Sequence, residues 1–394
     1  MAKPESAMDP VYLDWNATTP PLREAVDAVH RAALENWGNP ASVHRPGQRA
    51  RAELDRARAS IAALVGGHPR DVLLTSGGTE ANNLALRSAR GPIVLSRLEH
   101  PSVVRVAEAL EREGAVIGWV EPSSDGRVSP DRVAACIAAL GRVALVSLQA
   151  VNHETGVVQP LHEVAMIARA AGAQVHCDAV QAVGRLSREH WAAADFVSVA
   201  AHKLRGPKGI GALVTRPGAL VLPVLRGGDQ ERGMRPGTQD AALAAGFRIA
   251  AAHAIDGPAR YSRLGALRDR FEAAVVELGA GVGLRIERNG TASRAPHVTN
   301  LSFGSWSGPE LCAALDLEGV AISSGSACSA GTAEPSPVIR AIAGEARARG
   351  AIRVSLGELT SDADIARALV AFAHVLNVWR GSNPLEGSVP CFAP

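Results

Sequence analysis

Short apolar runs alternate with helical patterns between about residue 70 and residue 215. The apolar, β-branched runs predict buried strands, and the stretches between them carry apolar residues at the three- and four-residue spacing of a helix. The strands are expected at residues 72–75, 93–96, 143–148, 175–177, 196–199 and 211–214. Strands alternating with helices of roughly ten residues are typical of βαβ units, so the pattern predicts a mostly parallel, buried sheet.

A second, smaller α+β unit is expected after a helical stretch at residues 235–278. Its strands are predicted at residues 284–286, 298–303, 320–322 and 352–354. A last helix opens with Ser361 as its N-cap. The apolar residues of that helix recur at the helical period, at Ile365, Leu369, Phe372, Leu376 and Trp379. The Gly-, Ser- and Pro-rich residues 381–394 are expected to form a loosely held tail.

Composition and charge exclude several classes of function. The chain has 394 residues, and 41 Lys and Arg against 39 Asp and Glu leave a net charge of +2, which argues against a basic nucleic-acid surface. The N-terminus has no signal-peptide core, and the most apolar window, 241–255, is interrupted by Arg248 and too short to span a bilayer. Five cysteines without a Cys-x-x-Cys pair support neither disulfides nor zinc. We therefore expect a cytoplasmic protein with no metal site, no membrane segment and no direct contact with nucleic acid.

Chemically unusual residues follow the predicted strands, where parallel sheets bind their ligands. Residues 76–80, Ser-Gly-Gly-Thr-Glu, could hold a phosphate at a helix N-terminus, although taken alone they favour a tight turn with Thr79 as N-cap. Lys203 follows the strand 196–199, where desolvation favours the neutral, nucleophilic amine. An ordinary surface lysine is the alternative at this position.

Two further polar residues close predicted strands. Asp178 could pair with a buried cation, such as a protonated ring nitrogen, or simply cap the next helix. His100 could stack on a ring and move protons, or be structural. A phosphate cradle, a lysine, an aspartate and a histidine at the ends of different parallel strands together indicate pyridoxal 5′-phosphate (PLP).

Cys328 lies in residues 323–332, SSGSACSAGT, which contain almost no apolar anchor. Its thiol is therefore expected to be accessible, as a travelling nucleophile requires. Cys136 and Cys312 lie instead in apolar helical faces and are expected in the core.

Arg353 interrupts an apolar strand, and its planar guanidinium suits a carboxylate partner. Pairing with Glu358 and an outward-facing strand position are the alternatives. Residues 227–238 are too Gly-rich and charged for a core, and are expected to form a surface loop or a subunit contact.

Taken in their order along the chain, these motifs resemble those of the cysteine desulfurases, fold-type I PLP enzymes of the class V aminotransferase family. The matching segments are residues 12–14, 17–20, 38–44, 75–80, 99–100, Asp178 with Gln181, 202–203, 231–238, 323–328 and 355–357. The resemblance implies an α/β fold with a large PLP-binding domain, residues 21–258, built on a mostly parallel seven-stranded sheet. It also implies an N-terminal segment, 1–20, packed with the small domain. The smaller α+β C-terminal domain, 259–394, would carry the catalytic cysteine loop.

The resemblance implies catalytic roles for matching residues. Lys203 would carry PLP covalently, and His100 would stack on the ring and assist proton transfers. Arg353 would bind the substrate carboxylate, and Cys328 would be the nucleophile. The SSGSAC form points to the subgroup with a longer catalytic loop that feeds iron–sulfur or other sulfur acceptors.

The resemblance also implies a set of cofactor-binding residues. Asp178 would pair with the pyridine nitrogen, and Gln181 would bond the phenolic oxygen. The phosphate would be held by Gly78, Thr79 and His202, with Thr238 reaching in from the partner subunit of a homodimer.

Three positions depart from the family pattern. His153, still counted among the cofactor-binding residues, stands where an asparagine near the cofactor oxygen and substrate is usual. Ala200 replaces a frequent phosphate-binding serine, which removes a hydrogen bond worth about 1 kcal/mol. Asp229 replaces a glycine of the run before Glu231. We expect these changes to affect substrate preference more than cofactor binding.

The predicted reaction converts L-cysteine to L-alanine and leaves the sulfur on Cys328 as a persulfide, for a sulfur-acceptor protein such as an iron–sulfur scaffold or a sulfur carrier. A selenocysteine lyase or another PLP-dependent C–S lyase is the alternative among enzymes. A non-catalytic sulfur-relay or scaffold protein is the alternative of another class. Lys203, Asp178, His100 and Arg353 together argue against a chain that has lost its chemistry.

Overall fold

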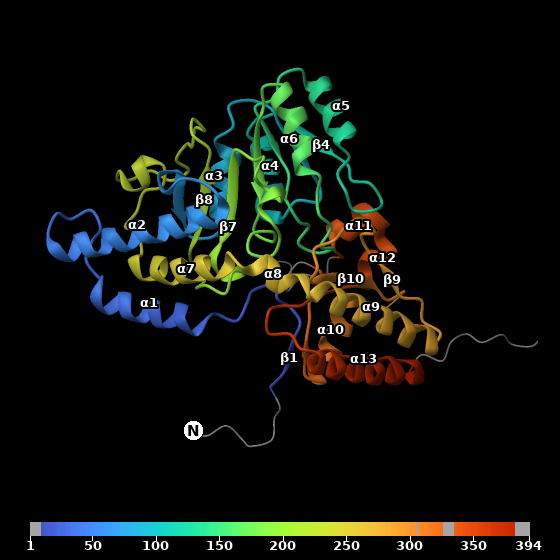
Figure 1. Ribbon diagram of the computed structural model, residues 1–394. Coiled ribbons are helices and arrows are strands. Elements are labelled where there is room, and N and C mark those ends of the chain that lie inside the picture. The colour runs from blue at the N-terminus through green and yellow to red at the C-terminus, as the bar shows by residue number, and fades with distance from the viewer. Residues whose placement is uncertain (1–8, 305, 326–334, 383–394) are drawn as a thin grey trace, which may run out of the picture.

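A seven-stranded sheet forms the centre of the larger of two units (Figure 1). The computed structural model describes residues 9–304, 306–325 and 335–382, with side chains up to residue 378. The strands of this sheet are β2 (Val72–Thr75), β3 (Ile93–Ser96), β4 (Ile117–Val120), β5 (Leu145–Ser147), β6 (Gln174–Asp178), β7 (Phe196–Ala200) and β8 (Gly211–Thr215). Their order is β2-β8-β7-β6-β5-β3-β4, and only β8 runs antiparallel to its neighbours. The predicted mostly parallel, seven-stranded sheet is therefore confirmed.

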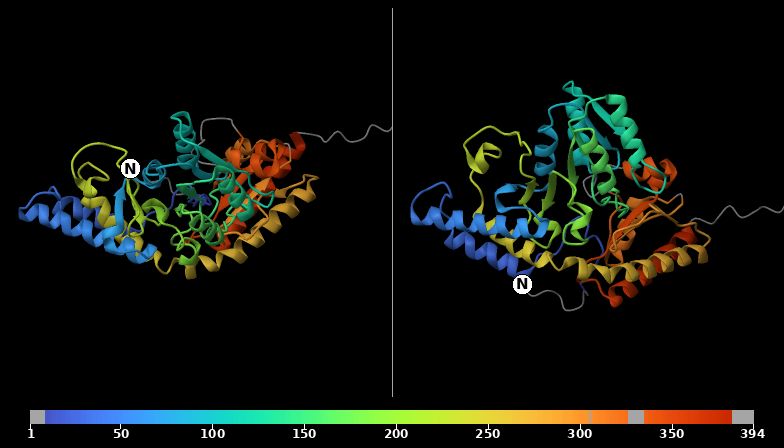
Figure 2. Two further views of the ribbon diagram at one scale, coloured as in Figure 1. Left: turned by 90° about the horizontal axis from the view of Figure 1, so that it is seen from above. Right: turned by 45° about the horizontal axis from the view of Figure 1, so that its top comes forward.

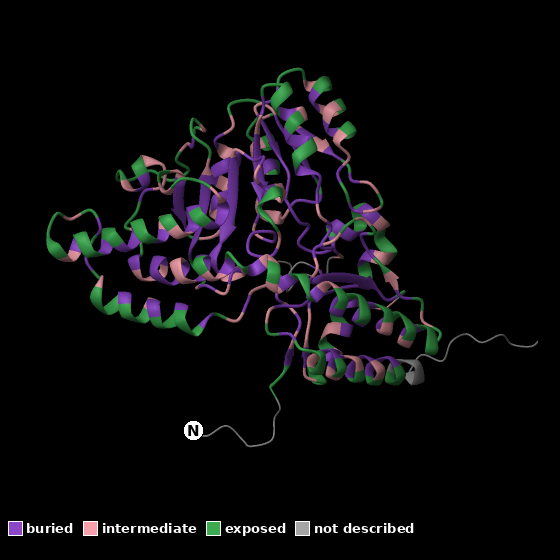
Figure 3. Cartoon of the chain, viewed as in Figure 1, coloured by how far each residue is buried: buried purple, intermediate pink, exposed green. Residues whose placement is uncertain are grey.

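Helices cover both faces of this sheet, which explains why its strands are continuous apolar runs rather than alternating ones. They are α2 (Arg45–Val65), α3 (Gly78–Arg87), α4 (Pro101–Arg112), α5 (Pro130–Leu140), α6 (Leu161–Ala170) and α7 (Ala241–Ala254), and α1 (Arg23–Glu35) packs outside them on α7. Figure 3 shows the buried strands enclosed by helices whose outward faces are exposed. The pattern of the chain did not single out β4, whose short Ile-Gly-Trp-Val run is only half buried.

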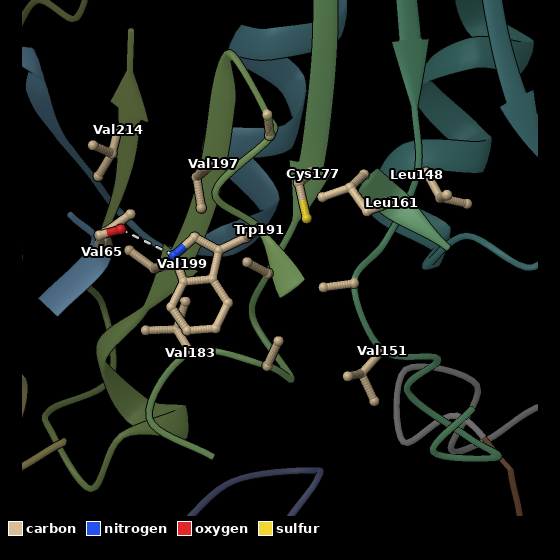
Figure 4. Close-up of a cluster of buried hydrophobic side chains, with 14 of the residues drawn as sticks. Val65, Leu148, Val151, Leu161, Cys177, Val183, Trp191, Val197, Val199 and Val214 are labelled. Carbon is tan, nitrogen blue, oxygen red and sulfur yellow. Dashed lines mark hydrogen bonds between the residues drawn. The ribbon is translucent and has the colours of Figure 1, made fainter. Parts of the chain in front are cut away.

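Small and branched residues fill the main core, because the chain has few aromatic residues. Figure 4 shows valines of β7 and β8 packed around Trp191, with Cys177 of β6 nearby. Trp191 is 3% exposed, and its Nε1 donates to the carbonyl oxygen of Val65 at 3.0 Å, which satisfies its one polar atom.

The smaller unit is an α+β layer. Its sheet has the order β12 (Ala351–Ser355), β10 (Val298–Ser302), β9 (Glu287–Arg288) and is antiparallel. The strand predicted at 284–286 is wrong in position, since pairing begins at Glu287. The helices are α8 (Gly257–Ser262), α9 (Leu264–Gly281), α10 (Gly308–Leu317), α11 (Pro337–Ala343), α12 (Glu345–Arg349) and α13 (Asp362–Ser382). Figure 2 shows α7, α8 and α9 following one another along one side of both units.

The last helix, α13, begins as its sequence predicts. Ser361 Oγ accepts from the backbone N–H of Asp364 at 3.2 Å, while Asp364 Oδ2 accepts from the N–H of Ser361 at 2.9 Å. This reciprocal cap satisfies two donors at the helix start. Phe372, fully buried on the apolar face of α13, lies 5.6 Å from Phe271 and 6.2 Å from Phe303, measured between ring centroids.

The N-terminal segment connects the two units. β1 (Val11–Tyr12) pairs in parallel with β11 (Val320–Ala321) of the smaller unit, and Asp14 bridges to Ser355. The chain then reaches the large unit, where the N–H of Thr19 donates to the carbonyl of His202 at 3.1 Å. The domain boundaries at residues 20 and 258 stay a prediction. Val338 and Ile339 of α11 follow residue 258 in the chain, yet they pack into the core of the large unit.

Gly211 on β8 sets the position of the turn that starts α3. A Cβ there would lie 2.6 Å from the carbonyl oxygen of Val199 and 2.7 Å from backbone atoms of Gly77. We expect Gly211→Ala to lower the free energy of unfolding by about 1–3 kcal/mol, because two backbones must separate. Urea denaturation would measure this change.

Gly281→Ala provides the control, because a Cβ there meets no atom within 4 Å. Alanine in a helix is favoured over glycine by roughly 0.5–1 kcal/mol, so this variant should be as stable as the parent or more so. Equal stabilities for Gly211→Ala and the parent would show that β8 and the turn can separate freely.

Candidate active site

A cavity of about 170 Å³ opens at the C-terminal edge of the large sheet, where β2, β3, β5, β6 and β7 end. It is lined by Ala17, Gly78, Thr79, Asn82, His100, Ser102, Gln149, Val151, His153, Asp178, Val180, Gln181, Ala200, His202 and Lys203. Eight of the residues singled out in the sequence therefore meet in one place. Parallel strands place their carboxyl ends at the same edge, which brings these distant segments together.

Lys203 ends the 3₁₀ turn η3 (Ala201–Lys203), directly after β7. Its Nζ donates to the backbone carbonyls of Asn16 and Ala17, the latter at 2.8 Å. The N-terminal segment thus holds the amine at the wall of the cavity. The small side chains of Ala200 and Ala201 before it leave room for a flat ligand.

Asp178 ends β6 and is 8% exposed. Its Oδ1 accepts from the N–H of Val180 at 3.1 Å, and its Oδ2 accepts from Asn82 Nδ2 at 2.8 Å. Both partners are neutral, so the cavity holds a carboxylate able to pair with a cationic ring nitrogen.

His100 is the N-cap of α4, and its Nδ1 accepts from the N–H of Ser102 at 3.1 Å. Burial lowers the pKa of His100 below its ordinary value. The carboxylate of Asp178 opposes this shift, while Lys203 and Arg353 add to it. The imidazole is therefore held in its neutral form.

His153 lies edge-on to His100, with 5.1 Å between ring centroids. Burial lowers the pKa of His153 well below its ordinary range, and His100, Arg353 and Lys203 lower it further. Neither ring nitrogen has a hydrogen-bond partner within the described part of the chain, although Nε2 lies 3.6 Å from Glu154 Oε1. Buried polar atoms are nearly always satisfied, so these nitrogens indicate a polar ligand in the cavity.

The start of α3 offers a site for an anion. A Cβ at Gly78 would lie 2.9 Å from Val180 Cγ2, so a side chain there would require Val180 to shift. His202 lines the same cavity, and its Nδ1 lies 3.1 Å from Thr18 Oγ1. Burial lowers the pKa of His202 to about 4, and the nearby Lys203, Lys208 and Arg185 contribute. His202 is thus a neutral hydrogen-bonding group beside the helix N-terminus, which itself attracts negative charge.

Asn16 makes several hydrogen bonds beside the cavity, although the sequence patterns did not single it out. Its carbonyl accepts from Gln181 Nε2 at 3.0 Å, and its side-chain Nδ2 donates to the carbonyl of His153 at 3.1 Å. Asn16 Oδ1 also accepts from Arg185, whose guanidinium donates to Gln181 Oε1 as well. Its only signal in the sequence is its place between the matched residues 12–14 and 17–20.

Arg353 lies behind the cavity rather than in its lining. It is 2% exposed, its Nη2 donates to Asp14 Oδ1 at 2.7 Å, and its Nη1 donates to the carbonyl of His153 at 3.1 Å. The alternatives of a partnership with Glu358 and an outward-facing position are both wrong. Glu358 bonds instead to His253 Nε2, at 2.8 Å.

Two candidate residues lie away from the cavity. Thr238 is exposed and follows the turn η4 (Gln230–Gly233), in a loop tied to α3 by Arg235 Nε and Glu80 Oε1 at 2.8 Å. Cys328 lies outside the described residues.

Cys136 and Cys312 are only partly buried, but each packs against a hydrophobic core, Cys136 against that of the large unit and Cys312 against that of the smaller unit. The prediction that both belong to the core therefore holds in part.

Residues 11–368 match the family model of the class-V aminotransferases. The chain belongs to this family. It is 39% identical over 387 residues to the cysteine desulfurase of Cereibacter sphaeroides, covering 96% of this chain and 98% of that protein. It is 37% identical over 389 residues to the cysteine desulfurase IscS of Anaeromyxobacter sp. (strain Fw109-5), covering 95% of each. A solved NifS-like protein superposes with a TM-score of 0.84 at 27% identity, over 94% of this chain and all of the other.

Class-V aminotransferases use PLP, and the cavity fits that cofactor. A primary amine, a carboxylate for the ring nitrogen and a glycine-started helix for the phosphate all face the same space. The unpartnered nitrogens of His153 add groups that need a polar ligand. The residues suited to hold PLP are Gly78, Thr79, His100, His153, Asp178, Gln181, His202 and Lys203.

The neutral imidazoles predict how stability depends on pH. Burial also lowers the pKa of His176, beneath the cavity, to about 4. Unfolded histidines bind protons below about pH 6.5, whereas these folded ones stay neutral, so stability should fall as the pH drops from about 6.5 to 4. Buried Glu99 and Glu154 oppose this trend, because their raised pKa favours the folded state in acid.

His176→Gln tests how much one imidazole contributes to this dependence of stability on pH. We expect it to reduce the loss of unfolding free energy between about pH 6.5 and 4 by roughly 2–3 kcal/mol, measured by urea denaturation of the PLP-free protein at several pH values. Exposed His30→Gln serves as the control and should keep the parent slope. If the free energy of unfolding of His176→Gln changed with pH as the parent's does, burial would not lower the pKa of His176.

Proposed function

We propose that this chain is a PLP-dependent cysteine desulfurase, which converts L-cysteine to L-alanine and transfers the sulfur to Cys328. The observation that carries the proposal is the amine of Lys203 in one cavity with the carboxylate of Asp178 and the imidazole of His100. Near full-length relatives named as cysteine desulfurases, at 36–39% identity, support the same activity.

PLP, when bound, supplies an electron sink for negative charge that develops at the substrate Cα. The chain's own residues supply binding, orientation and proton transfer. Asp178 would keep the ring nitrogen protonated, and Gln181 would bond the phenolic oxygen. Gly78, Thr79 and His202 would hold the phosphate, with Thr238 of a second subunit.

Lys203 is the group that carries protons at the reacting carbon. A released amine is a strong base, and the carbonyls of Asn16 and Ala17 keep it at the cavity wall. His100 would stack on the cofactor ring and assist these proton transfers. His153, unpartnered and neutral, binds an oxygen of the cofactor or the substrate.

The family resemblance assigns the nucleophile to Cys328, and three of the other thiols do not suit that step. Burial raises the pKa of Cys136, of Cys177 by a large amount, and of Cys312 to about 12. A thiolate is required to attack sulfur, so none of these three suits the step. In the transfer, the S–S bond to Cys328 forms as the substrate Cβ–S bond breaks, and the electron pair stays on the carbon fragment.

Arg353 is the receptor for the substrate carboxylate. Its guanidinium already donates to the carbonyl of His153, which lines the cavity, and it is balanced by Asp14. Its Nε has no hydrogen-bond partner among the described residues, so the guanidinium has a donor left for a second carboxylate. This favours substrates with a free α-carboxylate.

The working form is a homodimer in the cytoplasm that passes its sulfur to an acceptor protein, such as an iron–sulfur scaffold or a sulfur carrier. The exposed position of Thr238, outside the cavity of its own chain, supports a role in a partner's site. Within the described ranges, no helix has the length and apolar content needed to cross a membrane.

Attachment of the cofactor at Lys203 is the direct test of the proposal. We expect the purified protein to be coloured, borohydride to bleach it, and peptide mapping to find the reduced adduct on Lys203. Lys203→Ala should lose the adduct and at least about 10³-fold in kcat, because both attachment and proton transfer are removed. Lys208→Ala, on the same loop but exposed, is the control. An adduct on another residue, or none, would refute the proposal.

Cys328→Ala should keep the cofactor colour and the Lys203 adduct but form no protein persulfide. Mass spectrometry of the protein after a single turnover with L-cysteine measures this outcome. Cys312→Ala is the matched control and should form persulfide as the parent does, because burial keeps its thiol protonated. Full-rate formation of alanine by Cys328→Ala, with an added thiol reductant that collects the sulfur as sulfide, would show that Cys328 is not the nucleophile.

A further inference from the structure

Asn82 and Ser102 line the cavity, yet neither has a role in the proposed reaction. Asn82 lies on α3 and is 1% exposed, and Ser102 lies in the first turn of α4, the helix packed beside it. Asn82 Nδ2 donates both to Asp178 Oδ2 and to Ser102 Oγ, each at 2.8 Å. Ser102 Oγ in turn lies 2.7 Å from His100 Nδ1. One amide and one hydroxyl therefore connect the carboxylate to the imidazole.

The orientation of the Asn82 amide follows from its partners. A carboxylate accepts hydrogen bonds only, so the amide nitrogen, and not Oδ1, must face Asp178. The second hydrogen on Nδ2 then points to Ser102 Oγ. In this orientation Oδ1 has no partner among the described residues, so two donated bonds offset one unsatisfied acceptor.

The same logic determines the proton positions on Ser102 and His100. Because Ser102 Oγ accepts from Asn82, its own hydrogen is available for His100 Nδ1. The backbone N–H of Ser102 also points at Nδ1, at 3.1 Å. Two donors directed at one nitrogen require a lone pair there, so the neutral ring carries its hydrogen on Nε2.

We propose that Asn82 and Ser102 are positioning residues that tie Asp178 to His100 and hold His100 as the neutral tautomer protonated on Nε2. In the proposed desulfurase, on which this role rests, His100 is then a fixed hydrogen-bond donor rather than a cation. Asp178 and His100 also move as one unit, because the same amide group binds one directly and the other through Ser102.

Other groups around His100 agree with a neutral ring. The side chains that face it are Asp178 on β6, Lys203 on η3, Arg353 on β12 and His153 after β5. Only Asp178 favours a protonated imidazole, and the amide of Asn82 occupies one oxygen of that carboxylate. The N-terminus of α4 adds a positive potential that also disfavours the imidazolium.

NMR of protein labelled with ¹⁵N-histidine tests the tautomer without requiring activity. The His100 signal is identified by its loss in His100→Asn, and is followed with pH in PLP-free and PLP-bound protein. We expect a hydrogen on Nε2 and none on Nδ1. Ser102→Ala should raise the pKa of His100, because a donor to the neutral ring is lost, and Ser102→Thr should restore it.

Asn82→Ala is the discriminating variant, since Asn82 does not touch the ring. Without its amide, the Ser102 hydroxyl can rotate and accept from a protonated Nδ1, so the pKa of His100 should rise here too. The double variant should raise it by less than the sum of the two single changes, because both act through one hydroxyl. Exposed Ser262→Ala is the control.

Kinetics of the PLP-bound protein provide a second measurement. We expect Ser102→Ala to lower kcat about three- to tenfold with little change in KM and to shift the acid limb of the pH profile upward. Unchanged His100 signals in Ser102→Ala and Asn82→Ala, with the protein folded, would overturn the proposal. A protein that shows the expected signals but has no desulfurase activity would refute the proposed function and leave this proposal intact.

Discussion

The structure of the site depends on the contact between the Lys203 ammonium and the carbonyls of Asn16 and Ala17. These carbonyls belong to a segment whose first strand is paired with the smaller unit and whose next turn is bonded to the end of β7. One short stretch of backbone therefore positions the reactive amine, receives the Gln181 amide and supports the peptide of His153. The two units share the site because this segment belongs to both.

Burial of charge is the second constraint. Asp178 and Lys203 line the cavity at the sheet edge and Arg353 lies behind it, and each is bonded to neutral groups or an opposite charge. The imidazoles around them stay neutral, because burial and the neighbouring cations both disfavour protonation. The cavity thus offers one anionic group and several neutral donors and acceptors, which suits a ligand carrying a phosphate and a protonated ring nitrogen.

Much of this arrangement could be predicted from the chain alone. The strands β2, β3 and β6–β8 and the gathering of Gly78, His100, Asp178 and Lys203 follow from apolar runs and from the rule that parallel strands end at one edge. Their family match then supplied roles for the individual residues. The partner of Arg353 could not be found this way, because Asp14 lies 339 positions away and its pairing depends on how the N-terminal segment crosses between units.

Sequence pattern by itself determined the layer architecture, the ligand edge and the residue types that the chemistry needs, because these depend on local periodicity and on topology. Tertiary structure alone decided which protons and partners those residues have. Asn82 and Ser102 are ordinary helix residues in the sequence, and only the packing of α3 against α4 brings them between Asp178 and His100. Hydrogen bonds act over about 3 Å, a distance that no periodicity along the chain encodes.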